Sequence, residues 1–246
     1  DAARASRRVG LGLTGLGDAL AMLGVRYDAD AARAVAADAM RTINEAAYVA
    51  SVKIAREKGA FPLCDRERHL AAPFVAALPA ELRRAIARHG IRNSHLTAIA
   101  PAGTISLLAG NVSSGLEPIF ALAYDRAVRQ PDGELARTPV ASYALAEFRR
   151  RFGANAPLPA AFATVEAIAP NAQLAMQAAL QAHVDNAIAK TVNVAGDIAR
   201  DAFTAIYRSA YALGLKGCTV FRPNRVTGAV LSVPPTIERC CELPAS

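Results

Sequence analysis

The chain has 246 residues, 53% of them apolar, which is enough to bury the core of one large domain or two small ones. The formal net charge of +7 suits an anionic ligand such as a nucleotide, but no dense basic run with interleaved aromatic residues indicates direct nucleic-acid binding. The pattern of a membrane span, a secretory signal or a disulfide framework is missing, so we expect a cytoplasmic protein with no membrane segment.

Residues 7–24 combine a glycine-rich start with a short helix that ends at Gly24. The side chains expected on its buried face are Leu16, Ala19, Leu20 and Leu23. Gly10, Gly12 and Gly15 match a dinucleotide-binding fingerprint by letter. That fingerprint belongs to a βαβ unit with a later acidic residue, which does not follow here, so a dinucleotide-binding module is the weakest functional alternative.

A long helix is predicted from Ala29 to Lys58, with Asp28 as its N-cap and Gly59 ending it. Its buried stripe, at three- and four-residue steps, is expected to contain Val35, Ala39, Ile43, Ala47, Ala50 and Ile54. Another helix is predicted to begin near Pro79 and to end at Gly90. Leu82 and Ile86 form its apolar edge.

The histidine residues show no metal-ligand pattern. His69, His89 and His183 lack partners at the spacing of metal ligands, and Cys64 stands alone in a loop, so no metal site is predicted. His95, at the start of the next strand, is the one histidine that remains a candidate functional residue.

The clearest site pattern lies between His95 and Pro118. Residues 96–100 have the length and composition of a buried strand, and the proline that follows ends its pairing. A tight turn leads into a helix predicted for residues 105–109, which ends at Gly110. A strand, a small-residue turn and a helix N-terminus present free N–H groups at one point, which predicts a phosphate site. The predicted site residues are Pro101, Ala102, Gly103, Thr104, Ile105 and Ser106.

Within this loop, two side chains and one glycine have specific expected roles. Thr104 and Ser106 are expected to add hydroxyl donors, and Gly103 is expected to let the backbone come close to a ligand.

Residues 120–160 are less regular and resemble an insertion. We predict a strand at 124–129, a turn at Pro131-Asp132-Gly133, a helix at 143–152 and a loop at 153–159.

The last regular part of the chain predicts a strand–helix–strand unit. A helix from Pro170 to about Ala182 precedes a strand at 191–194 and a helix at 197–213 that ends at Gly214. The inward residues of the second helix are predicted to be Ile198, Ala202, Ile206, Ala210 and Leu213. A strand at 217–221 follows, and the short joints imply that the two strands are parallel.

Several of these blocks, in the same order along the chain, resemble one known family. They are Arg7-Arg8-x-Gly10-x-Gly12, His95 to Ser106, Gly110 to Pro118, Gln181 to Val194 and Leu213 to Asn224. They are similar to the large-subunit barrel of ribonucleotide reductases, and most to the adenosylcobalamin-dependent (class II) branch. The resemblance implies an α/β fold, with the C-terminal part of a ten-stranded α/β barrel at residues 1–232. Past Asn224 the periodicity is lost and Val233-Pro234-Pro235 is typical of a linker, which predicts a flexible tail at 233–246.

The resemblance also implies chemistry. In that family the Pro-x-Gly-Thr-x-Ser loop, here Pro101 to Ser106, holds the substrate's phosphates, and Ala102 stands where Thr or Ser is expected. Reductases that draw their radical from a separate subunit carry paired tyrosines near the last strand, whereas residues 218–221 contain none, which favours adenosylcobalamin as cofactor. The implied function is reduction of ribonucleoside di- or triphosphates to 2′-deoxyribonucleotides for DNA synthesis. A thioredoxin-like reductant is the implied partner, and a homodimer of the full-length enzyme fits the family.

The family's catalytic Asn-x-Cys-x-Glu loop is not found in the sequence, so no catalytic residue is assigned. We expect that loop to lie upstream of Asp1 and the chain to be a piece of a longer protein. Glu117 is expected to orient neighbouring loops. Cys240 and Cys241 match either a reducing cysteine pair in a tail or an accident of truncation. The alternative function is a non-catalytic half-barrel that binds a nucleotide or a partner without turnover.

Overall fold

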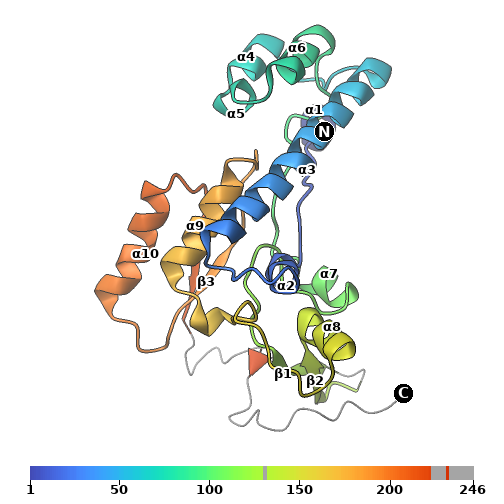
Figure 1. Cartoon of the computed structure of the whole chain (residues 1–246). Coiled ribbons are helices and arrows are strands. Elements are labelled where there is room, and N and C mark those ends of the chain that lie inside the picture. Colours follow the sequence, from blue (N-terminus) through green and yellow to red (C-terminus); the bar gives the residue numbers. More distant parts are fainter. Residues whose placement is uncertain (130–131, 223–230, 233–246) are drawn as a thin grey trace.

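The structure is a computed structural model that describes residues 1–129, 132–222 and 231–232 (Figure 1). The first half of the chain is helical. Its elements are α1 (Ala2–Ser6), α2 (Leu16–Met22), α3 (Asp30–Lys58), α4 (Arg66–Ala71), α5 (Pro73–Ala76), α6 (Ala80–His89) and α7 (Gly103–Leu108). Helices α4 to α6 form a small extension at the end of α3, away from the rest of the chain (Figure 1).

The second half alternates strands and helices. Its elements are β1 (Ala123–Arg129), β2 (Leu135–Ala141), α8 (Tyr143–Phe152), the 3₁₀ turn η1 (Val165–Ala167), α9 (Pro170–Gln181), β3 (Thr191–Asn193), α10 (Arg200–Ala212), β4 (Thr219–Phe221) and β5 (Leu231–Ser232). Strands β2, β1 and β5 form an antiparallel sheet in that order, whereas β3 and β4 pair in parallel. The predicted strand–helix–strand unit is therefore confirmed.

Parallel pairing extends beyond β3 and β4 through single bridges. Leu11 pairs with Thr97, and Ile99 pairs with Ile188, just before β3. Residues 9–11, 96–99, 186–193 and 219–221 thus lie side by side as one arc of parallel segments. The predicted mixture of helices and parallel strands is confirmed, but the described residues form no closed sheet, and a ten-stranded barrel is not visible in them.

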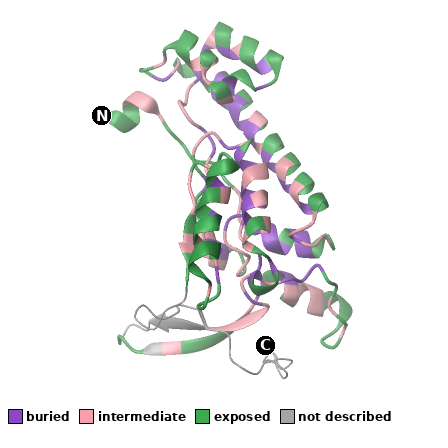
Figure 2. Cartoon of the chain, turned by 90° about the vertical axis from the view of Figure 1, so that its left-hand side faces the viewer, coloured by how far each residue is buried: buried purple, intermediate pink, exposed green. Residues whose placement is uncertain are grey.

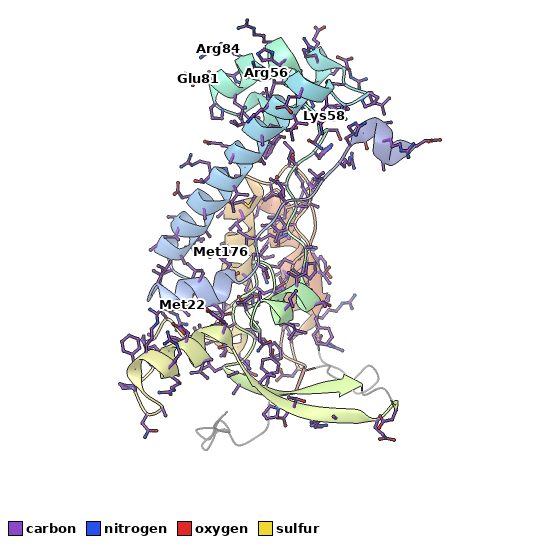
Figure 3. The ribbon with its side chains drawn as sticks, turned by 90° about the vertical axis from the view of Figure 1, so that its right-hand side faces the viewer. Met22, Arg56, Lys58, Glu81, Arg84 and Met176 are labelled. Carbon is purple, nitrogen blue, oxygen red and sulfur yellow. The ribbon has the colours of Figure 1, made fainter. Side chains whose placement is uncertain are left out.

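The core lies where α3 and α9 pack over this arc. Met176 of α9 is fully buried there, whereas Met22 at the end of α2 is 45% exposed (Figure 3). A second cluster joins the far half of α3 to α4–α6. Arg56 and Lys58 at the end of α3, and Glu81 and Arg84 on α6, point outward there (Figure 3). On α10, Ile206 and Ala210 face β3, while most of the outer surface is exposed (Figure 2).

The predicted buried stripe of α3 is wrong. Of its six members only Ala47 is buried; Val35, Ala39, Ala50 and Ile54 are exposed, and Ile43 is partly buried. The helix instead buries a face that includes Asn44, Tyr48 and Ser51 among its apolar residues. These polar groups are tolerated because distant residues satisfy them: Tyr48 binds Asp185, and Ser51 binds Asn93.

Two other expectations about helices also fail. The N-cap of α3 is Ala29, because the carboxylate of Asp28 is paired with Arg26 at 2.7 Å. In α2, Ala19 and Leu23 are exposed, and the buried face holds Gly17, Asp18 and Ala21 together with Leu16 and Leu20.

The boundaries of the remaining helices match the predicted boundaries more closely. Helix α8 has the predicted bounds, and α6 and α9 differ from prediction by about one residue at an end. Helix α7 begins two residues early at Gly103, and α10 begins three residues late at Arg200. Ala202 and Leu213, which were predicted to face inward, are exposed. The turn before β2 is present at Asp132 and Gly133, while Pro131, the tail 233–246 and its Cys240 and Cys241 lie outside the described residues.

Candidate functional site

One large cavity, of about 1160 Å³, opens at the carboxyl ends of the parallel segments. Pro101 follows the segment 96–99, Val194 follows β3, and Phe221 ends β4, and all three line the cavity. Side chains and backbone groups that follow parallel strands converge at one edge of a sheet, which is where ligands bind in open and closed α/β folds.

The predicted phosphate loop borders this cavity. Pro101, Gly103 and Ser106 line it. Ala102 is the N-cap of α7 in a left-handed conformation, with φ of 51°. As the first three residues of the helix, Gly103, Thr104 and Ile105 have N–H groups without an acceptor in the preceding turn. The other three predicted site residues, Ala102, Thr104 and Ile105, are not among the residues that line the cavity, and Thr104 and Ile105 are exposed.

Ser106 does not offer the hydroxyl donor that its sequence position suggested. Its side chain is 3% exposed, and its Oγ lies 2.7 Å from the carbonyl oxygen of Ala102 and 3.0 Å from that of Gly103. The Oγ also lies 3.3 Å from Ser114 Oγ, so the hydrogen-bonding neighbours of this hydroxyl belong to the loop itself, which it holds in shape.

Glu117 and Lys190 form a buried ion pair in the cavity wall that the sequence did not reveal as a pair. Lys190 Nζ lies 2.5 Å from Glu117 Oε2 and donates also to Gln173 Oε1 and to the carbonyl of Thr191, both at 3.0 Å. The other oxygen of Glu117 accepts the N–H of Thr191 at 3.0 Å. The expected role of Glu117, orienting neighbouring loops, fits this link between residues 113–118 and β3. A lysine directly before a short strand was the available signal for its partner.

Asp18 is a second carboxylate in the wall, and sequence reasoning missed it. It is 2% exposed and accepts the backbone N–H groups of Ser113 at 2.6 Å and Ala144 at 2.7 Å. It thereby joins α2, the loop after α7 and the N-terminus of α8, whose dipole favours a negative charge. A charged residue on the apolar face of a short helix was the signal that could have identified it.

Asn111 fastens the same loop to the β1–β2 hairpin. Its amide donates to the carbonyl of Ala141 at 2.8 Å, and its oxygen accepts the hydroxyl of Tyr124 at 2.8 Å. Both Asn111 and Tyr124 line the cavity, so the hairpin contributes to the site.

His95 lies at the opposite end of its strand and is not among the residues that line the cavity. Burial lowers its pKa, with further repulsion from Arg8. The nearby carboxylate of Asp185 accepts the N–H groups of Leu96 at 2.7 Å and Thr97 at 2.9 Å. The structure therefore gives His95 no place in the candidate site.

The glycines of the dinucleotide-like motif face the chain itself. A Cβ on Gly12 would lie 2.2 Å from the carbonyl oxygen of Ala98, and one on Gly15 would contact Val112. These glycines allow close packing of neighbouring segments. In the described ranges, no group of three or more His, Cys, Asp or Glu residues is placed to hold a metal ion. None of the described helices is long and apolar enough to cross a membrane.

Comparison with known proteins gives a family for this arrangement. The ribonucleotide reductase barrel domain matches residues 1–221. The vitamin B12-dependent ribonucleoside-diphosphate reductase of Mycobacterium tuberculosis H37Rv is 39% identical over 248 aligned residues, covering 94% of this chain and 33% of that protein. The enzyme of the same name from Thermoplasma acidophilum is 32% identical over 251 residues, covering 93% of this chain and 30% of its own.

A relative that matches a smaller part of the chain has a different name. The ribonucleoside-diphosphate reductase subunit alpha of Treponema pallidum is 36% identical over 120 residues, covering 46% of this chain and 14% of that protein. The chain thus spans about a third of the length of the first two relatives and less of the third. The match over residues 1–221 shows that this chain belongs to the ribonucleotide reductase barrel-domain family.

Proposed function

We propose that this chain forms the substrate-positioning part of an adenosylcobalamin-dependent ribonucleoside-diphosphate (or triphosphate) reductase, which makes 2′-deoxyribonucleotides for DNA synthesis by radical chemistry. The observation that carries the proposal is the cavity at the carboxyl ends of parallel segments, with the N-terminus of α7 at its edge. The names of the relatives from Mycobacterium tuberculosis and Thermoplasma acidophilum favour a diphosphate substrate. The arc of parallel segments would be the C-terminal part of the ten-stranded barrel.

In this proposal the chain's own residues bind and orient the substrate. The N–H groups of Gly103, Thr104 and Ile105 donate to phosphate oxygens, as free N–H groups at a helix N-terminus can do. Ser106 keeps the turn in shape, and Asp18 and Glu117 keep residues 113–118 in place as the facing wall. No residue of this chain is assigned to the chemical step, because the family's Asn-x-Cys-x-Glu loop is not found in its sequence.

The cavity also fits the cofactor that these relatives' names imply. Its volume of about 1160 Å³ exceeds that of a typical small-molecule pocket. Phe120, Tyr124 and Phe221 line it with aromatic surface and would hold an adenosyl group. When bound, adenosylcobalamin supplies the radical that starts the reduction. A thioredoxin-like reductant, a cytoplasmic location and a homodimer of the full-length enzyme belong to the same proposal.

The phosphate-loop assignment is tested by Gly103→Val in the full-length protein. A Cβ on Gly103 meets nothing within 4 Å, so the chain tolerates the side chain, while its methyl groups obstruct a ligand at the N–H groups. We expect affinity for a ribonucleoside diphosphate, measured by calorimetry, to fall at least about tenfold, as expected for loss of one to two hydrogen bonds to a charged group.

Ala102→Ser is the matched control, because it changes the adjacent residue without blocking the N–H groups, and it should bind as the wild type does. Unchanged nucleotide affinity in Gly103→Val would refute the phosphate-loop assignment. Nucleotide binding without any turnover in the full-length protein would favour the alternative of a non-catalytic half-barrel.

A further inference from the structure

The charges that line the cavity are an unexpected feature for a site that holds phosphates. Three carboxylates, those of Asp18, Glu117 and Glu166, lie among the described lining residues, whereas none of those residues is Lys or Arg. An anionic ligand placed in such a cavity is repelled by each carboxylate that lacks compensation. Glu166 is exposed, so solvent screens its charge, whereas the less exposed carboxylates of Asp18 and Glu117 need groups that offset them.

Backbone N–H groups offset the negative charge of Asp18. Its two oxygens accept the N–H groups of Ser113 and Ala144, and the second of these belongs to the N-terminus of α8, the positive end of a helix dipole. Because both groups are provided by the chain's own fold, this carboxylate requires no cation.

Glu117 is compensated by a cation that lies behind the wall. The side chain of Lys190 has no exposed surface, and all three of its N–H groups are used, by Glu117, Gln173 and the carbonyl of Thr191. The side chain of Glu117 is 17% exposed and faces the cavity. The lysine therefore cannot reach a ligand directly, but its charge lies directly behind the carboxylate that can.

Keeping a charged lysine at this position has an energetic cost. Burial lowers the pKa of Lys190, and the neighbouring Glu117 carboxylate opposes that shift. The other titratable groups that face the pair are Tyr27, whose pKa is raised by burial and by Glu117, and the thiol of Cys218. An apolar pair of similar volume is often as stable as a buried ion pair, so stability alone does not explain why this one is present.

We propose that Lys190 is a positioning and charge-balancing residue: it neutralises Glu117 from behind the cavity wall, so that the cavity accepts an anionic ligand. The inference rests on the proposed function for the identity of that ligand, a nucleoside diphosphate. If Lys190 had a purely structural role, its removal would weaken binding by displacing the cavity wall. In the charge-balancing role, its removal weakens binding because the charge of the Glu117 carboxylate is no longer balanced.

The test compares single and double substitutions in the full-length protein. In Lys190→Met the carboxylate loses its cation, and we expect affinity for a ribonucleoside diphosphate to fall about tenfold, the order expected for a nearby like charge at low screening. In Glu117→Gln/Lys190→Met the charge is gone while an oxygen remains for the N–H of Thr191, and affinity should return to within about threefold of the wild type. An uncharged nucleoside should bind the three proteins equally well.

Lys216→Met is the control for net charge. Lys216 donates to the backbone carbonyl of Asp185 at 2.7 Å, at the other end of the strands, and it does not line the cavity. Its substitution removes the same charge from the protein and should leave nucleotide affinity unchanged. An equal loss of affinity in Lys190→Met and in the double variant, or a loss shared by the uncharged nucleoside, would overturn the charge-balancing role and leave a structural one.

If the wild type binds no nucleotide, the proposed function is refuted. A second measurement then still tests whether Lys190 balances the charge of Glu117. In chemical denaturation, Lys190→Met should unfold at a lower denaturant concentration than the wild type. Glu117→Gln/Lys190→Met should recover part of that loss, because no carboxylate is left without its cation. A double variant that is no more stable than Lys190→Met would show that Glu117 does not depend on Lys190 for its charge, and the inference would fail.

Discussion

Carboxylates accept backbone N–H groups at both ends of the parallel segments, but the surroundings of these carboxylates differ. At the amino end, Asp185 accepts the N–H groups of Leu96 and Thr97, together with the hydroxyl of Tyr48 at 3.0 Å. At the carboxyl end, Asp18 and Glu117 also accept backbone N–H groups, but they do so at the surface of a cavity of about 1160 Å³. A carboxylate that binds backbone groups is therefore not by itself a sign of a functional site; the space beside it makes the difference.

The amino end has no such space because it is packed. Tyr48 is 1% exposed and belongs to the cluster that joins α3 to the extension α4–α6, together with Leu96. We therefore expect substitutions at the amino end to change stability and substitutions at the carboxyl end to change binding.

The largest effect is expected for Asp185→Ala at the amino end. The substitution leaves two backbone N–H groups and the hydroxyl of Tyr48 without their acceptor, which should cost about 3 kcal/mol of the free energy of unfolding. Tyr48→Phe, which removes one of these donors, should cost only about 1 kcal/mol. Both are measured by denaturant unfolding. A large loss of nucleotide affinity in a folded Asp185→Ala protein would contradict the separation of the two ends.

A matched pair of glycine substitutions should show an intermediate effect. Gly12→Ala places a Cβ 2.2 Å from the backbone oxygen of Ala98, so a packed segment must move, at a cost of about 2 kcal/mol. Gly103→Ala meets nothing within 4 Å and should change the free energy of unfolding by less than about 1 kcal/mol. Equal thermal unfolding midpoints for the two variants would show that the contrast in packing is not real.

The smallest effect is expected from acidification. His69 packs edge-on against Phe61 in the helical extension, and among the described residues its buried Nε2 has no hydrogen-bond partner. Burial lowers its pKa, and His95 lowers it further. Because the unfolded state then binds a proton more readily, stability present at neutral pH is lost as the pH falls below about 6.5 towards the lowered folded value.

In the His69→Phe variant, the free energy of unfolding should therefore fall less between pH 7 and pH 5 than in the wild type. His183→Phe offers a comparison within the same chain, because burial also lowers the pKa of His183 but on a different part of the fold. An unchanged pH dependence in His69→Phe would show that this histidine is not the source of the acid sensitivity.

Local patterns identified most elements of the chain. Pro79 and Gly90 marked the limits of α6, and Pro170 marked the start of α9. Alternating short strands and helices predicted the parallel pair β3 and β4. These features could be predicted because turn geometry and helix ends depend on residues that are close in sequence. The motif at residues 101–106 was found for the same reason, and the structure places it beside the cavity.

The predictions that failed concern residues whose environment depends on tertiary contacts. The buried face of α3 was assigned from apolar spacing, but it contains Asn44, Tyr48 and Ser51, whose partners Thr97, Asp185 and Asn93 lie 42 to 137 residues away. Likewise, the internal use of the Ser106 hydroxyl became evident only from its distances to Ala102 and Gly103.

The sequence by itself determined the family, most of the longer helices and the position of the phosphate-loop motif, because each is encoded in contiguous residues; α4, α5 and β2 were not predicted. Only the tertiary structure decided which charges surround the cavity. Glu117 and Lys190 are 73 residues apart and become an ion pair because β3 lies beside residues 113–118. Burial and charge balance are properties of packed neighbours, and no local pattern specifies those neighbours.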